Sequence, residues 1–175
     1  MNGPRPAQDS TPQRTTLMVL KIAFAMSGVF LGVIAYALTE MNPVALGEPM
    51  DEVVLYAIAG VALVNLAAGF VAPGMLIRDE LIVAEMKGAV EASRRESRAE
   101  EAADVAWRAG ISRYMTRSIL GLAIMESAGI LGLMVALLGG EPVYAYGMIA
   151  AATLAMMVTP VSGLEALVSR VLREV

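Results

Sequence analysis

Residues 118–139 read SILGLAIMESAGILGLMVALLG, an apolar run whose only charged residue is Glu126. A helix needs about 20 apolar residues to cross the hydrocarbon core of a bilayer, so this run is long enough to span it. A carboxylate at that depth is costly and usually marks a functional position. The run therefore predicts a transmembrane helix, and it makes Glu126 the first candidate functional residue.

The composition of the whole chain agrees with a membrane protein. Of its 175 residues, 57% are hydrophobic and only 17% are charged, whereas soluble domains have about 45–50% apolar and about 25% charged residues. Apolar stretches of spanning length or nearly so occupy residues 17–38, 53–75, 115–138 and 143–159. The sequence therefore predicts an all-α, polytopic protein with four transmembrane helices and the lipid bilayer as its surroundings.

The basic residues predict the orientation. All 13 Lys and Arg lie before the first apolar stretch or within its first turns, between the second and third or within the first turn of the third, or after the fourth. The loop at residues 39–52 has four acidic residues and no basic one. By the positive-inside rule, both termini and the central segment are expected on the cytoplasmic side of the cytoplasmic (inner) membrane. We expect Lys21 to extend toward the lipid headgroups.

One alternative concerns the first helix. Basic residues, an apolar run and the small-residue pattern Ala35-Tyr36-Ala37 also fit a signal peptide cleaved after residue 37. Both a retained helix and a cleaved one are open at this point.

Five segments are expected along the chain. They are a disordered cytoplasmic tail (1–16), a first transmembrane hairpin (17–75), a charged cytoplasmic helical segment (76–111), a second hairpin (112–160) and an amphipathic interfacial helix (161–175).

The charged segment has the sequence of a helix. It is rich in good helix formers, it has no proline, and it has opposite charges four residues apart, as in Glu91 with Arg95. We expect this segment to be helical; one unbroken helix would cover residues 79–109, and Gly88 or Gly110 could break it. Two roles are open: a solvated connector, or a surface at residues 78–108 that docks a cytoplasmic protein.

Several chemistries are excluded by what the sequence lacks. Cysteine and histidine are both absent, so there are no disulfides, no Cys/His zinc sites and no Cys or His for nucleophilic catalysis. The net charge of −4 gives no reason to expect nucleic-acid binding. No nucleotide-binding or metalloprotease motif is found. We therefore expect a non-enzymatic protein without a cofactor or a metal site.

Polar residues recur at one depth of the four predicted spans. Counting inward from the ends of each span places five of them near the middle: Ser27, Asn65, Glu126, Ser127 and Thr153. Polar side chains that face lipid are unfavourable, so these should point inward. Glu126 is the predicted proton or cation site, with Asn65, Ser127 and Thr153 as possible ligands or hydrogen-bond partners.

The role of Glu126 itself has two interpretations. An ionised carboxylate is disfavoured in low dielectric, so a buried Glu126 should be protonated at neutral pH unless a cation accompanies it. The neutral acid could act as a hydrogen-bonding link between helices. Alternatively, the group could titrate and thereby bind or relay a proton or a small cation.

Small residues predict close helix packing. Gly28 and Gly32 form a G-x-x-x-G pattern, and Ala128 and Gly132 form a small-x-x-x-small pair beside Glu126. These positions favour a homo-oligomer or a subunit of a larger membrane complex.

Residues 121–138, GLAIMESAGILGLMVALL, resemble the carboxylate-bearing helix of the rotary ATP synthase c-subunit family. The resemblance implies that Glu126 is an ion site, that Ser127 is its neighbour, and that this helix borders a cytoplasmic loop. It covers these 18 residues only. Residues 53–75 lack the closely repeated glycines of that family's packing helix.

Overall fold

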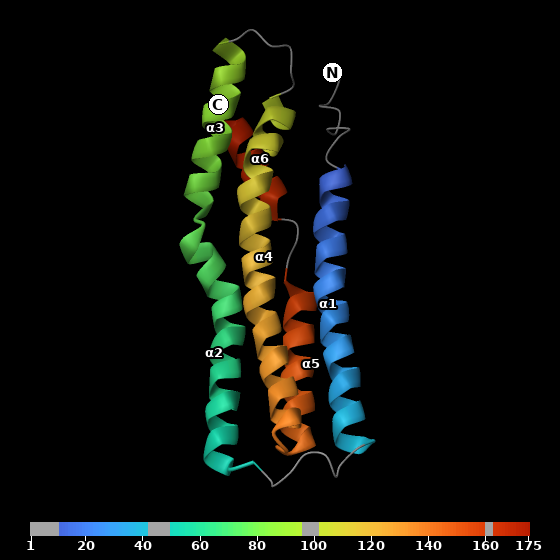
Figure 1. The fold of residues 1–175 in the computed structure, drawn as a ribbon. Helices are drawn as coiled ribbons and strands as arrows, with labels where there is room; N and C mark the ends of the chain where they lie inside the picture. The colour runs from blue at the N-terminus through green and yellow to red at the C-terminus, as the bar shows by residue number, and fades with distance from the viewer. Residues whose placement is uncertain (1–10, 42–49, 96–101, 160–162) are drawn as a thin grey trace. The chain divides into compact units, whose positions relative to one another are not determined.

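The computed structural model describes residues 11–41, 50–95, 102–159 and 163–175, and within them it contains only helices, turns and short irregular stretches. The expected all-α class is therefore confirmed. The helices are α1 (Thr11–Glu40), α2 (Glu52–Leu76), α3 (Asp79–Arg95), α4 (Ala102–Leu137), α5 (Pro142–Val158) and α6 (Gly163–Glu174) (Figure 1).

Four helical segments are long and apolar enough to cross a membrane. By length and composition these are Thr15–Glu40, Glu52–Arg95, Ala102–Leu137 and Pro142–Glu174, within the described residues. Each includes all or nearly all of one apolar stretch of the sequence. The first helix begins earlier than expected, because residues 11–16, which we assigned to a disordered tail, are helical. Residues 1–10 lie outside the described part of the chain.

The described residues of the charged segment are helical except for residues 77 and 78, and α3 begins at Asp79, where we expected the helix to begin. Pro73 lies inside α2, which ends at Leu76. After α2, the Ile77 N–H still donates to the Pro73 carbonyl (2.9 Å). In the first turn of α3, the Leu81 N–H donates to the Arg78 carbonyl (3.0 Å). Gly88 and Gly110, the expected break points, lie inside α3 and α4. The part of the expected helix at residues 96–101 lies outside the described residues.

The chain divides into two compact units. The first comprises residues 1–19, 73–119 and 160–175, and the second comprises residues 20–72 and 120–159. We call them the charged unit and the apolar unit, since the first contains most of the ionisable residues and the second most of the apolar stretches.

The charged unit has a hydrophobic core of its own. Side chains of α3, of the first part of α4, of α6 and of the start of α1 form one buried cluster: Ile82, Val83, Met86, Val90, Ala106, Trp107, Tyr114, Leu164, Leu167, Val168, Val171 and Leu17. The apolar face of α6 was expected to lie on lipid. It is buried against protein instead, because α3 and α4 offer it a complementary apolar surface. This part of the chain is thus a small folded unit.

Ion pairs join the helices of the charged unit at its surface. Lys87 of α3 contacts Glu174 of α6 (Nζ–Oε2 2.5 Å), and Arg113 of α4 pairs with Glu85 of α3. Lys87 and Arg170, which both bond Glu174, lower the pKa of that carboxyl. These side chains are substantially exposed, so such pairs contribute little to stability. Their main effect is to set how the helices face one another.

The apolar unit packs through small residues. Ala62, Ala128 and Ala152, from α2, α4 and α5, form one buried layer. A Cβ added to Gly132 would lie 2.8 Å from the Ala145 carbonyl oxygen. Such distances are possible only where two helix backbones lie very close together.

Candidate functional site

The apolar unit exposes many large apolar side chains as well as burying others, and its polar residues at mid-depth are partly covered. Phe30, Leu63 and Leu154 are 66%, 67% and 61% exposed. In contrast, all five of the polar residues that we expected at mid-depth are partly buried. Water-soluble proteins show the reverse arrangement, because apolar surface is driven out of water. The surface of this unit is suited to contact with lipid.

Glu126 of α4 is hydrogen-bonded to α1. The Ser27 hydroxyl donates to Glu126 Oε1, and both side chains are partly buried. The expectation of a buried glutamate is thus met only in part, since no charged side chain among the described residues is fully buried. Within the described residues no Lys or Arg is paired with Glu126.

Asn65 and Ser127 form a second pair, between α2 and α4. Asn65 Nδ2 donates to Ser127 Oγ (2.9 Å), and the Ser127 hydroxyl donates to the Ile124 carbonyl of its own helix (2.6 Å). We had considered Asn65 as a partner of Glu126, whereas the structure pairs it with Ser127. The reason is rotational, because residues 126 and 127 point about 100° apart around α4 and so face different neighbours.

Thr153 bonds its own helix. Its hydroxyl donates to the Ile149 carbonyl one turn earlier (2.8 Å), as Ser and Thr in helices often do. The same hydroxyl lies where a Cβ on Gly28 would be. Thr153 therefore marks a close contact between α1 and α5, and its hydrogen bond does not reach Glu126.

The chemistry available to this site is limited. One carboxylate with one hydroxyl donor can accept hydrogen bonds and can exchange a proton. Within the described ranges no group of three or more His, Cys, Asp or Glu side chains could hold a metal ion. A multidentate cation site would thus need backbone carbonyls, hydroxyls or a partner molecule.

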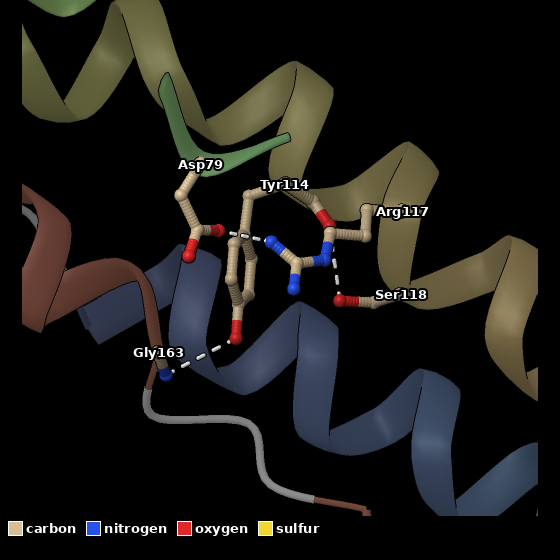
Figure 2. Close-up of polar contacts among 5 residues, drawn as sticks. All are labelled: Asp79, Tyr114, Arg117, Ser118 and Gly163. Atoms are coloured by element: carbon tan, nitrogen blue, oxygen red, sulfur yellow. Dashed lines mark hydrogen bonds and ion pairs between the residues drawn. The ribbon is translucent and has the colours of Figure 1, made fainter. Parts of the chain in front are cut away.

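A second polar cluster, in the charged unit, was not found by sequence reasoning (Figure 2). The Tyr114 hydroxyl accepts a hydrogen bond from the backbone N–H of Gly163, the first residue of α6 (3.1 Å). Arg117, one turn along α4, pairs with Asp79 at the start of α3. Ser118 Oγ donates to the Tyr114 carbonyl (2.9 Å). The cluster attaches the N-terminal ends of α3 and α6 to α4.

The sequence contained a partial signal for this cluster. A carboxylate in the first turn of a helix, such as that of Asp79, interacts favourably with the positive end of the helix dipole. Nothing in the sequence indicates which residue pairs with it. The Tyr114 ring lies in the core of the charged unit.

Lys21 of α1 bonds the end of α5. Its ammonium donates to the Thr159 carbonyl (2.8 Å), and Thr159 is the C-cap residue of α5. The Lys21 ammonium thus pairs with a carbonyl at the C-terminal end of α5. Its positive charge interacts favourably with the negative end of the α5 dipole.

No family model, curated protein or solved structure matches this chain. The resemblance of residues 121–138 to the c-subunit helix therefore stays a hypothesis. The function is inferred below from the geometry of the two units.

Proposed function

We propose that the protein is a non-enzymatic, integral membrane scaffold. In this proposal the apolar unit is a four-helix transmembrane bundle of the cytoplasmic membrane, with both termini and the charged unit on the cytoplasmic side. The apolar exterior of that bundle and the one-sided distribution of Lys and Arg support this arrangement.

One observation carries the role of Glu126. Two adjacent residues of α4, Glu126 and Ser127, accept hydrogen bonds from Ser27 of α1 and Asn65 of α2. Each of these four polar side chains thus has a partner on another helix, which is the arrangement expected of interhelical hydrogen-bonding links. We infer that Glu126 holds the bundle together.

The charged unit is the part that would bind a cytoplasmic partner. Its core fixes the orientation of α3, so that the exposed charged residues Glu80, Glu91 and Arg95 lie on a defined surface. Charged surfaces of this kind give partner selectivity and fast association more than affinity. A cytoplasmic protein docked on residues 78–108 is therefore our proposed partner, and assembly into a homo-oligomer or membrane complex remains part of the proposal.

A second candidate function is proton or cation exchange at Glu126. It is supported by the partial exposure of this carboxyl and by the absence of a basic partner among the described residues. In that case, carbodiimide labelling of Glu126 should decline with rising pH or be blocked by sodium.

Substitutions at Glu126 distinguish the two functions. Glutamine keeps an oxygen that can accept the Ser27 hydrogen bond, so Glu126→Gln should change the free energy of unfolding by less than about 0.5 kcal/mol. Glu126→Leu removes the acceptor and leaves the Ser27 hydroxyl unpaired, which should cost about 1–2 kcal/mol. Unfolding in mixed micelles, followed by circular dichroism, measures both.

The matched control is Ser27→Ala, which removes only the donor and should cost about 0.6–1.7 kcal/mol. The ion-exchange function predicts a different result. There, Glu126→Gln abolishes pH-dependent flux into vesicles while the protein stays folded, and that outcome would replace the scaffold proposal.

A further inference from the structure

A groove lies between α1 and α5 in the apolar unit. Its volume is about 460 Å³, and its lining includes Gly28, Gly32, Tyr146, Ile149, Thr153 and Met157. Gly32 leaves space that a side chain would otherwise fill, whereas the Thr153 hydroxyl already occupies the position of a Cβ on Gly28. A Cβ on Gly32 would meet nothing closer than the Ile149 Cγ2 atom at 3.8 Å.

The groove requires an apolar occupant. Its two hydroxyl groups already have partners, since the Thr153 hydroxyl bonds the Ile149 carbonyl and the Tyr146 hydroxyl lies 2.6 Å from Thr39 Oγ1. No charged residue lines it. A polar ligand would gain no hydrogen bond there and would lose its own hydration.

The groove is elongated along α5. Its lining from Tyr146 to Met157 extends about 16 Å at 1.5 Å per residue. A long groove with apolar walls suits a hydrocarbon chain, which gains by removing its surface from water.

A cation lies at one end of the groove. Lys21, Gly28 and Gly32 are spaced seven and four residues apart, which places them within about 20° of one line along α1. The Lys21 ammonium bonds the Thr159 carbonyl, two residues beyond Met157. An ammonium has three donors, and the described residues provide a partner for one of them. Among the described residues, the other two donors and the positive charge are thus left for an anion.

We propose that this groove binds one acyl chain of an anionic phospholipid, with the phosphate on Lys21. The inference rests on the proposed insertion of the apolar unit in a membrane. Apolar contact holds the chain, and the ammonium selects the headgroup, because a Lys near an anionic lipid surface contributes about a fivefold change in affinity. In the proposed orientation the site faces the cytoplasmic leaflet.

The test is native mass spectrometry of the full chain in detergent, with phosphatidylglycerol or phosphatidylcholine of the same acyl composition. The wild type should retain one phosphatidylglycerol about five times better than phosphatidylcholine. Lys21→Gln should abolish this preference, and Lys21→Arg should keep it. Glutamine removes the charge and keeps an N–H donor on a side chain that is one bond shorter than that of lysine.

A second variant tests the groove itself. Gly32→Leu places a side chain in the groove and should remove binding of both lipids. Gly60→Leu is the matched control, because a Cβ on Gly60 meets nothing within 4 Å, and it should bind lipid as the wild type does.

Three outcomes would overturn the lipid site: equal retention of the two lipids by the wild type, an unchanged preference in Lys21→Gln, or a Gly32→Leu variant that changes only the oligomeric mass. The last outcome would assign the groove to a second copy of the chain. Alkaline extraction of membranes tests the proposed function separately. Release of the protein by alkali would contradict the proposed insertion in the membrane. If the protein resists alkali but shows no lipid preference, only the proposed lipid site is contradicted.

Discussion

Replacing Gly132 with alanine is expected to destabilise the apolar unit by about 2–3 kcal/mol, the upper part of the range for overpacking a well-packed contact. The added Cβ would lie 2.8 Å from the Ala145 carbonyl oxygen and 3.0 Å from Met148 Cβ. A backbone carbonyl cannot rotate away as a flexible side chain can, so α5 must shift as a whole. The free energy of unfolding in mixed micelles measures the cost.

Gly32→Ala is the matched control for this prediction. Both glycines were singled out in the sequence as packing positions, but a Cβ added to Gly32 would be in ordinary contact, 3.8 Å from the Ile149 side chain. Alanine also favours the helical state over glycine by about 1 kcal/mol. Gly32→Ala should thus be neutral or stabilising, and equal losses in the two variants would contradict the close α4–α5 contact.

Met86→Ala should destabilise the charged unit by about 2–5 kcal/mol, the usual cost of truncating a large buried side chain. Met86 is fully buried among the side chains of α3, α4 and α6. Because the charged unit has its own core, the loss should affect its helices before those of the apolar unit. Hydrogen exchange of the backbone amides, read by mass spectrometry, locates the effect in α3, α4 and α6.

Leu81→Ala is the control on the same helix. Leu81 is 48% exposed, so its truncation should cost well under half as much as that of Met86. A solvated connector, which we considered from the sequence, would respond weakly and equally to both changes. A clear difference between the two variants therefore distinguishes a folded unit from a connector.

The helical class could be predicted because its causes are local. Each apolar stretch is of spanning length or nearly so and lacks strand-like alternation, so length and composition suffice. The helix ends were harder to place. The charged segment contains no proline, and we expected a helix from residue 79 that a glycine could break. The start of α3 at Asp79 agrees with that expectation, whereas Gly88 and Gly110 stay helical.

The candidate residues at mid-depth could also be predicted, since counting inward from helix ends locates depth. Their pairing could not. Whether Asn65 meets Glu126 or Ser127 depends on how far each helix is rotated about its axis, and on which helix lies beside which. Neither quantity is encoded in spacing within one helix.

The sequence by itself determined that this chain is helical, that its helices are apolar enough to cross a membrane, and that Glu126 is the one carboxylate within the four apolar stretches. These properties depend on residue type and on spacing along the chain. Only the tertiary structure decided that α6 buries its apolar face in a core with α3 and α4, and that Glu126 accepts a hydrogen bond from Ser27. An amphipathic face can be covered by lipid or by protein, and a polar side chain can pair with any neighbour within reach. Both choices depend on contacts between segments that are far apart in the chain.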